Sequence, residues 1–231
     1  HLGDYVFVEK GGEIIPKIVG VDTDNRDPDA IPVTFAEICP ECGTPLVRYE
    51  GEAIHYCPND TGCPPQIRGR IEHFISRKAM NIESLGPETI DDYYRHGLVK
   101  NVADLYDIDV QQINGDGSRE KSARKIVDGI EASKQVPFER VVFALGIRLV
   151  GETTAKLLAR HFQNIDKLMA ATLDELTHID GIGEVVAKSV ITYFHTQNNV
   201  EIVERLRKYG LQMSLSQEQL DSHTELLKGM T

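Results

Sequence analysis

Four cysteines constrain what this chain can fold into more than any other feature of its sequence. They are the only cysteines among 231 residues, and their spacing is Cys39-x2-Cys42-x14-Cys57-x5-Cys63. Two intervening residues let Cys39 and Cys42 reach one ion from a tight turn, and Gly43 can supply the positive φ that such a turn needs. Four thiolates with no spare cysteine match a closed, tetrahedral structural zinc site with Zn–S bonds of about 2.3 Å. The sequence therefore predicts one structural Zn²⁺ held by Cys39, Cys42, Cys57 and Cys63.

Two disulfide bonds are the alternative use of these cysteines. The sequence contains no visible signal peptide, and a chain of 231 residues does not need covalent cross-links to form a core. These features favour a reducing intracellular compartment, and hence zinc. His55 and His73 lie near the cysteines, but four thiolates already fill the coordination shell. Both histidines are therefore expected to be surface or packing residues.

The charge balance argues against a general nucleic-acid binder, because the formal net charge is −11. A local basic patch runs against this trend. Within residues 64–80, the basic side chains of Arg68, Arg70, Arg77 and Lys78 are set against Glu72 alone. Backbone amides, which a charge count does not register, can also bind phosphate. No apolar run is long enough for a transmembrane helix, so we expect no membrane partner.

An internal repeat is the second informative feature. The clearest copy runs from Leu176 to Ala187 and reads as a helix, a two-glycine turn at Gly181 and Gly183, and a second helix. Three further copies are centred on Gly86, Arg119 and Gly151. The steps between the aligned turn positions are 33, 32 and 32 residues, a regular period that indicates one supersecondary unit stacked several times.

The glycine turns suggest a way to bind DNA in spite of the acidic composition. A glycine corner exposes backbone N–H groups at the positive end of a helix, which is a phosphate site that needs no basic side chain. We therefore predict DNA contacts at two full corners. At Gly86, where Ser84 replaces the first glycine, phosphate binding and a purely structural turn are equally favoured. The predicted contact residues are Gly181, Gly183, Lys188, Gly151, Thr153, Lys156, Gly86, Arg68 and Arg70. A plain helical packing unit or protein-interaction module is the alternative, and it is the preferred interpretation of the Arg119 copy.

The remaining segments predict a mainly α, multidomain chain. Residues 5–8 and 14–19 read as two strands, with Pro16 at an edge or a bulge. Residues 22–37 read as a linker, 68–80 as a helix, and 200–209 as a helix capped near Gly210. The predicted domains are 1–38, a strand pair plus linker; 39–66, the zinc finger; 67–213, an all-α domain of four helix-hairpin-helix copies; and 214–231, a linker.

The order of these features resembles the C-terminal half of bacterial NAD-dependent DNA ligases. The resemblance rests on the four-cysteine spacing followed by four hairpins, and on the segment from Phe143 to Glu152. Gly3 to Val6 and Glu13 to Pro16 resemble the end of that family's OB-fold domain. Leu227 to Thr231 resemble the start of its BRCT domain. The degenerate second hairpin, at Arg119, departs from the family pattern.

The resemblance implies the DNA-clamping part of an enzyme that seals nicks between a 5′-phosphate and a 3′-hydroxyl during replication and repair. The family's adenylation motif, Lys-x-Asp-Gly, has no match here, since Lys125 to Gly129 has one residue too many. The catalytic lysine and the NAD site are therefore expected in a preceding adenylation domain, and this chain is expected to be inactive alone. The implied partner is nicked duplex DNA, bound by a monomer in the bacterial cytoplasm. The alternative is a zinc-bearing helix-hairpin-helix scaffold of a repair or recombination nuclease.

Overall fold

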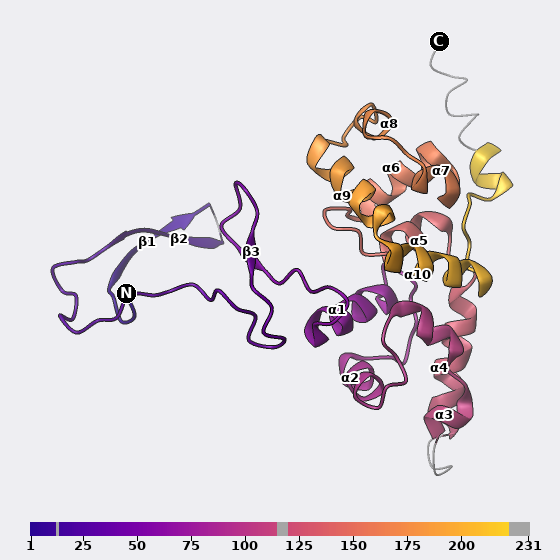
Figure 1. Ribbon diagram of the computed structural model, residues 1–231, viewed down its shortest axis with the longest axis horizontal. Helices are drawn as coiled ribbons and strands as arrows, with labels where there is room; N and C mark the ends of the chain where they lie inside the picture. Colours follow the sequence, from indigo (N-terminus) through magenta and orange to yellow (C-terminus); the bar gives the residue numbers. More distant parts are fainter. Residues whose placement is uncertain (13, 115–119, 222–231) are drawn as a thin grey trace. The chain divides into compact units, whose positions relative to one another are not determined.

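A computed structural model describes residues 1–12, 14–114 and 120–221 (Figure 1). The chain divides into two compact units, His1–Asn59 and the part from Asp60 onward. The first unit contains two small antiparallel sheets, and the second is built from helices. The prediction of a mainly α chain is confirmed. Among the described residues, no helix has the length and apolar character that crossing a membrane requires.

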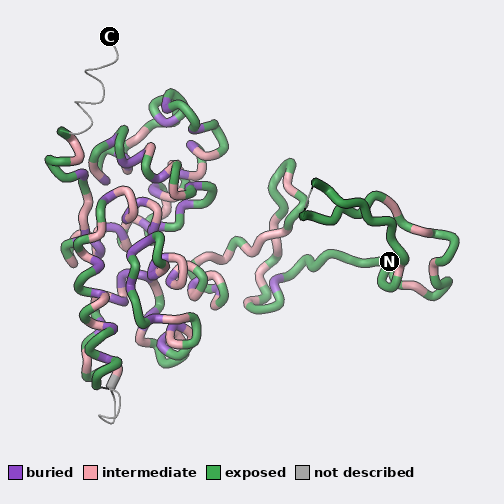
Figure 2. Tube along the Cα trace, turned by 180° about the vertical axis from the view of Figure 1, so that it is seen from behind, coloured by how far each residue is buried: buried purple, intermediate pink, exposed green. Residues whose placement is uncertain are grey.

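Two strands form a hairpin at the start of the first unit. Strand β1, Val6–Gly11, pairs antiparallel with β2, Ile15–Val21, so both strands run further than the sequence predicts. Pro16 pairs in register with Lys10, and the irregularity lies instead opposite the step from Phe7 to Val8. Apolar side chains on both faces of this hairpin are exposed. Figure 2 accordingly colours nearly the whole segment as exposed. Residues 22–37 contain no helix or strand, as expected of a linker.

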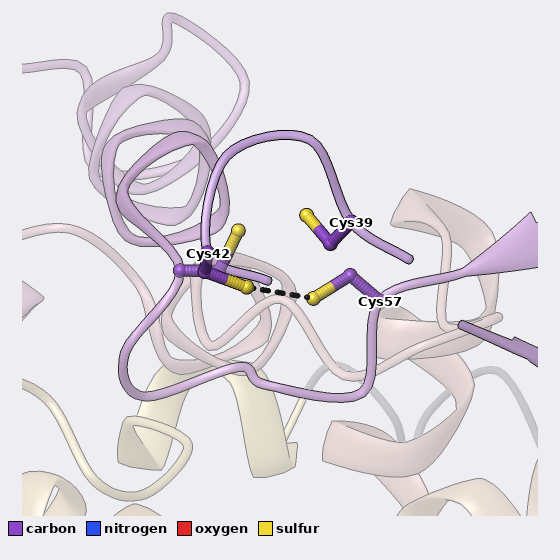
Figure 3. Close-up of side chains that lie close together, drawn as sticks. Cys39, Cys42 and Cys57 are labelled. Carbon is purple, nitrogen blue, oxygen red and sulfur yellow. Dashed lines mark hydrogen bonds between the residues drawn. The ribbon is translucent and has the colours of Figure 1, made fainter. Parts of the chain in front are cut away.

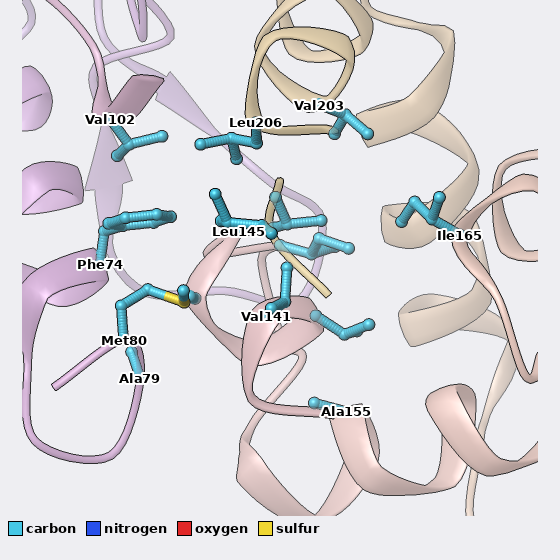
Figure 4. Close-up of a cluster of buried hydrophobic side chains, with 14 of the residues drawn as sticks. Phe74, Ala79, Met80, Val102, Val141, Leu145, Ala155, Ile165, Val203 and Leu206 are labelled. Atoms are coloured by element: carbon cyan, nitrogen blue, oxygen red, sulfur yellow. The ribbon is translucent and has the colours of Figure 1, made fainter. Parts of the chain in front are cut away.

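The second unit packs its helices around one hydrophobic core (Figure 4). Phe74, Val141 and Leu206 are fully buried in it, although they are far apart in the sequence. The elements are α1 Pro64–Ile75, α2 Pro87–Arg95, the 3₁₀ helix η1 Val102–Asp107, α3 Val110–Asn114, α4 Glu120–Ser133, α5 Phe138–Ala144, α6 Glu152–Phe162, α7 Ile165–Met169, α8 Leu173–Thr177, α9 Glu184–His195 and α10 Gln197–Lys208.

Helix α1 begins earlier and ends earlier than the predicted span of 68–80. Pro64 and Pro65 occupy its first turn, where the missing N–H groups would have no intrahelical partner in any case. Its buried face, which includes Ile71 and Phe74, is as predicted. The helix stops at Ser76, and the chain then folds back so that the N–H of Met80 donates to the carbonyl of Phe74 at 3.0 Å. The prolines therefore mark the start of the helix.

The C-terminal part of the described chain packs against the helical unit. Helix α10 begins three residues before the predicted Val200, and Gly210 ends it with φ +89°, as expected of a C-terminal glycine. Beyond the predicted domain end at 213, Leu215 is buried and its N–H donates to the carbonyl of Gln163 at 2.8 Å. Packing therefore continues past residue 213. The Arg119 turn and residues 222–231, with the predicted BRCT-like start, lie outside the described residues.

Candidate metal centre and nucleic-acid interface

A tight turn presents the first cysteine pair. The N–H of Gly43 donates to the carbonyl of Cys39 at 2.9 Å, and that of Cys39 to the carbonyl of Thr44 at 2.8 Å. Gly43 adopts φ +71°, the left-handed conformation that the sequence predicts for it. The short strands β3, Val47–Arg48, and β4, His55–Tyr56, then pair and lead the chain to Cys57. Cys63 is the N-cap residue of α1.

The four sulfur atoms are arranged for one shared ion. All four Sγ atoms lie within 4.8 Å of one another, and those of Cys42 and Cys57 are 3.5 Å apart (Figure 3). Tetrahedral zinc with bonds of about 2.3 Å would place its sulfur ligands about 3.8 Å apart, whereas a disulfide needs about 2.05 Å. No disulfide bond joins any of the four cysteines, so the disulfide alternative is wrong. The residues present therefore fit a structural zinc ion.

The immediate surroundings favour the thiolate form that a metal requires. Thr44 Oγ1 lies 3.2 Å from Cys42 Sγ, and hydrogen bonding by the hydroxyl and backbone of Thr44 lowers the pKa of Cys42 to about 6. His55 stacks on Phe35 with ring centroids 5.3 Å apart, and His73 Nε2 lies 2.8 Å from the carbonyl oxygen of Phe143. Both histidines are packing residues, as predicted, and the metal-binding cluster among the described residues holds cysteines alone.

Three hairpin corners share one backbone pattern. Gly86, Gly151 and Gly183 are the N-cap residues of α2, α6 and α9. The residue two positions earlier has positive φ in every case, and the residue just before the glycine is buried. The positive-φ residues are Ser84 (+69°), Leu149 (+66°) and Gly181 (+87°); the buried ones are Leu85, Val150 and Ile182. The Gly86 corner therefore keeps the turn geometry, although Ser84 replaces a glycine there.

The corners leave their helix starts open. No side chain forms a capping hydrogen bond at any of the three helix starts. A Cβ built on any of the three N-cap glycines would meet no atom within 4 Å. Gly151 and Gly183 are exposed, and Gly86 is half-buried. The starts of α6 and α9, where the first-turn N–H groups have no intrahelical partner, thus lie beside open space at the positive end of each helix. An anion can approach the backbone closely at both corners.

Reciprocal contacts join the last two hairpins. Ser189 of α9 donates its hydroxyl to the carbonyl of Arg148, in the turn before α6, at 2.5 Å. In return, Leu157 of α6 packs against the turn before α9, 3.6 Å from a Cβ built at Gly181. Leu157 and Ser189 occupy the same position in their helices, six residues after Gly151 and Gly183. The two corners are therefore held together by pseudo-symmetric packing, which fixes their separation.

Acidic residues that the sequence analysis missed sit directly at both corners. Glu152 and Glu184 are the first residues of α6 and α9, and each pairs with the predicted contact lysine one turn later. The Lys156–Glu152 distance is 3.2 Å and the Lys188–Glu184 distance is 2.6 Å. These lysine partners lower the pKa of both carboxyl groups, so both are ionised at neutral pH. Thr153 is exposed beside Glu152.

The two predicted arginine contacts are engaged within the helical unit. Arg68 pairs with Asp91 of α2, and Arg70 pairs with Asp60 at 2.9 Å. Both side chains are about one-third exposed, at 28% and 37%. In order to bind DNA, each guanidinium would have to be shared between its carboxylate partner and a phosphate. Their positions on α1 separate them in sequence from the two open corners, which carry the clearer anion-binding geometry.

The cysteine cluster and the hairpins both match regions of known proteins. The model of the NAD-dependent DNA ligase C4 zinc finger domain matches residues 39–64, and that of the helix-hairpin-helix motif matches residues 140–203. The DNA ligase of Phocaeicola vulgatus is 56% identical over 230 residues, 99% of this chain and 35% of the relative. The chain matches a portion of the bacterial DNA ligases. The DNA ligase of Bacteroides fragilis is likewise 56% identical over 232 residues, all of this chain and 35% of that ligase.

The matched regions coincide with the structural features described above. The zinc finger match begins at Cys39 and ends just after Cys63, and the helix-hairpin-helix match contains the Gly151 and Gly183 corners. The chain spans about a third of the length of the curated ligases that it matches. The activity of those whole enzymes therefore cannot be assigned to this chain from the match alone.

Proposed function

We propose that this chain is the DNA-binding, nick-clamping part of an NAD-dependent DNA ligase that seals 5′-phosphate/3′-hydroxyl nicks during replication and repair. The observation that carries the proposal is the pair of open, amide-lined corners at Gly151 and Gly183, held at a fixed separation by reciprocal packing. Two such corners bind phosphates without reading bases, so binding is independent of sequence. This explains how a chain of net charge −11 binds a polyanion.

The other units have supporting roles in this proposal. The exposed strands β1 and β2 belong to an OB-fold barrel whose other strands would cover their apolar side chains. A zinc ion held by Cys39, Cys42, Cys57 and Cys63 would fix the loop that leads into α1. The helical domain would comprise four hairpins, of which the Arg119 turn lies outside the described residues. The adenylation lysine and the NAD site belong to another domain of the enzyme, so this chain alone does not seal nicks; it acts as a monomer in the bacterial cytoplasm.

The second candidate is a zinc-bearing scaffold of a repair or recombination nuclease. Its support is the helix-hairpin-helix motif alone, which carries no ligase chemistry. The zinc finger match is to a ligase domain, and the relatives named above are DNA ligases. These observations favour the ligase proposal over the scaffold.

Binding to nicked DNA tests the proposal directly. We expect the 231-residue chain to shift a nicked duplex in a gel and to bind single-stranded DNA of the same length more weakly. The affinity should fall steeply with salt, because phosphate contacts release counterions. Addition of the adenylation domain should strengthen the preference for a nick over an intact duplex. Absence of any salt-dependent duplex binding would contradict the proposal.

The acidic residue at the second corner gives a prediction of increased affinity. Glu184→Gln removes a charge beside the proposed phosphate site and releases Lys188 from its 2.6 Å pair. We expect about three- to tenfold tighter binding to nicked duplex at low salt, because an exposed ion pair stabilises the fold little while a nearby like charge repels phosphate. Fluorescence anisotropy with a labelled duplex measures this. Glu201→Gln, on the exposed side of α10, is the matched control and should leave affinity unchanged.

A further inference from the structure

The described part of the helical unit exposes three large apolar side chains, and all three lie in the last two hairpins. They are Leu149 (47% exposed), Val185 (67%) and Leu173 (37%). Leu149 lies two residues before the Gly151 corner, and Val185 lies two residues after the Gly183 corner. Scattered apolar side chains need no explanation on a surface, but two at the two anion-binding corners do.

A hydrogen bond joins the segments that carry Leu149 and Val185, although the two residues come from different hairpins. Ser189 of α9 donates to the carbonyl of Arg148, the residue next to Leu149, at 2.5 Å. Val185 precedes Ser189 by one helical turn and therefore lies on the same face of α9. Each of the two exposed apolar side chains thus flanks one corner, Leu149 just before α6 and Val185 in the first turn of α9.

Leu149 is also in a backbone conformation that leucine rarely adopts. Its φ is +66°, in the left-handed region, where glycine and asparagine are favoured and a bulky side chain is strained. The equivalent position in the next hairpin is Gly181, which has φ +87° and no such conflict. A glycine or asparagine at position 149 would relieve the strain. The leucine therefore does not serve the stability of the turn.

We propose that Leu149 and Val185 form a nonpolar contact with the sugar edges of the minor groove, and that this contact makes the clamp selective for deoxyribose over ribose strands. The inference rests on the proposed function, since it requires a duplex with phosphates at the two corners. The minor groove of B-form DNA is narrow, is bounded by two rows of phosphates, and has deoxyribose along its edges. An A-form duplex instead presents 2′-hydroxyl groups in a wide, shallow minor groove.

The chemistry of the pair explains the selectivity. The carbon atoms of deoxyribose can pack against Leu149 and Val185 without loss of any hydrogen bond. A 2′-hydroxyl pressed against the same side chains would lose its water and gain no partner, which is unfavourable. A polar residue at either position would remove this difference. Selectivity is thus expected to depend on these two side chains rather than on the lysines, which see the same phosphates in both duplexes.

Two substitutions test the inference without disturbing the fold. Leu149→Asn places a residue that tolerates φ +66° in the strained position, so its Tm should equal or exceed that of the wild type. Val185→Thr keeps the shape and the β-branched side chain but adds a hydroxyl. Leu173→Asn, at the third exposed apolar residue and away from the corners, is the matched control. Affinities are measured for a nicked DNA duplex and for the same nicked duplex with RNA as the continuous strand.

We expect the wild type to prefer the all-DNA duplex. The double variant should lose about tenfold in affinity for that duplex and less than twofold for the hybrid. Wild-type DNA affinity in the double variant, or an equal loss on both duplexes, would overturn the inference while the proposed function stands. Loss of self-association with both affinities unchanged would assign the pair to a protein contact instead. A wild-type chain that binds neither duplex would contradict the proposed function, and the inference with it.

Discussion

Cys57→Ser is expected to abolish zinc binding at the four-cysteine site and to unfold residues 39–63. The Sγ atom of Cys57 lies 3.5 Å from that of Cys42 in the sulfur cluster, and serine cannot replace its thiolate as a soft ligand. Two strands of two residues each, β3 and β4, cannot hold the loop without a metal ion. Since metal binding and folding are coupled in such modules, we expect affinity for zinc to fall more than about a hundredfold.

Zinc content and local order measure this effect separately. Elemental analysis should give one zinc per wild-type chain and far less in Cys57→Ser, and limited proteolysis should cut the variant within residues 39–63. The helical circular dichroism should change little, because the hydrophobic core lies in the helical unit, from Ile67 onward. His55→Ala is the matched control, since this histidine stacks on Phe35 and is outside the cluster. Wild-type protein that purifies without zinc would refute the assignment.

Local patterns explain why the metal centre and the hairpins were predictable. Cysteine spacing alone brings Cys39 and Cys42 to one turn, and the glycine period marks the helix starts at Gly151 and Gly183 within one residue. The same local reasoning placed the start of α1 four residues too late, although a proline pair is well suited to the first turn of a helix. The early start of α1 also depends on the burial of Ile67 and Ile71 in the core, which the sequence alone did not reveal.

Tertiary contacts account for what the sequence did not predict. Arg68 looks available in sequence, but its partner Asp91 is 23 residues away and reaches it only after α2 has packed on α1. The doubt about Gly86 came from the identity of Ser84, whereas the surrounding fold imposes φ +69° on that serine. Leu149 was detectable: it aligns with Gly181 in the repeat, and a leucine at a glycine position signals a residue kept for another purpose.

Gly151→Val and Gly183→Val together are expected to remove most of the affinity for nicked DNA without unfolding the chain. Both glycines adopt extended φ, −80° in each case, which valine tolerates, and an added Cβ would meet no atom within 4 Å. The absence of a side chain at these positions is therefore not required by packing. The valine methyl groups would instead occupy the space beside the first-turn amides, where a phosphate is proposed to bind.

The size of the loss follows from the hydrogen bonds to each phosphate. A charge-assisted hydrogen bond contributes about 1.5–3 kcal/mol, so blocking one corner should weaken binding at least about tenfold, and blocking both about a hundredfold. Thr196→Val provides the matched control, since it places the same side chain at the N-cap of α10, with φ −86° and outside the glycine corners. Isothermal titration with nicked duplex, paired with thermal unfolding, separates binding from stability. Wild-type affinity in the double variant would show that DNA does not bind at these amides, because the corners themselves would remain folded.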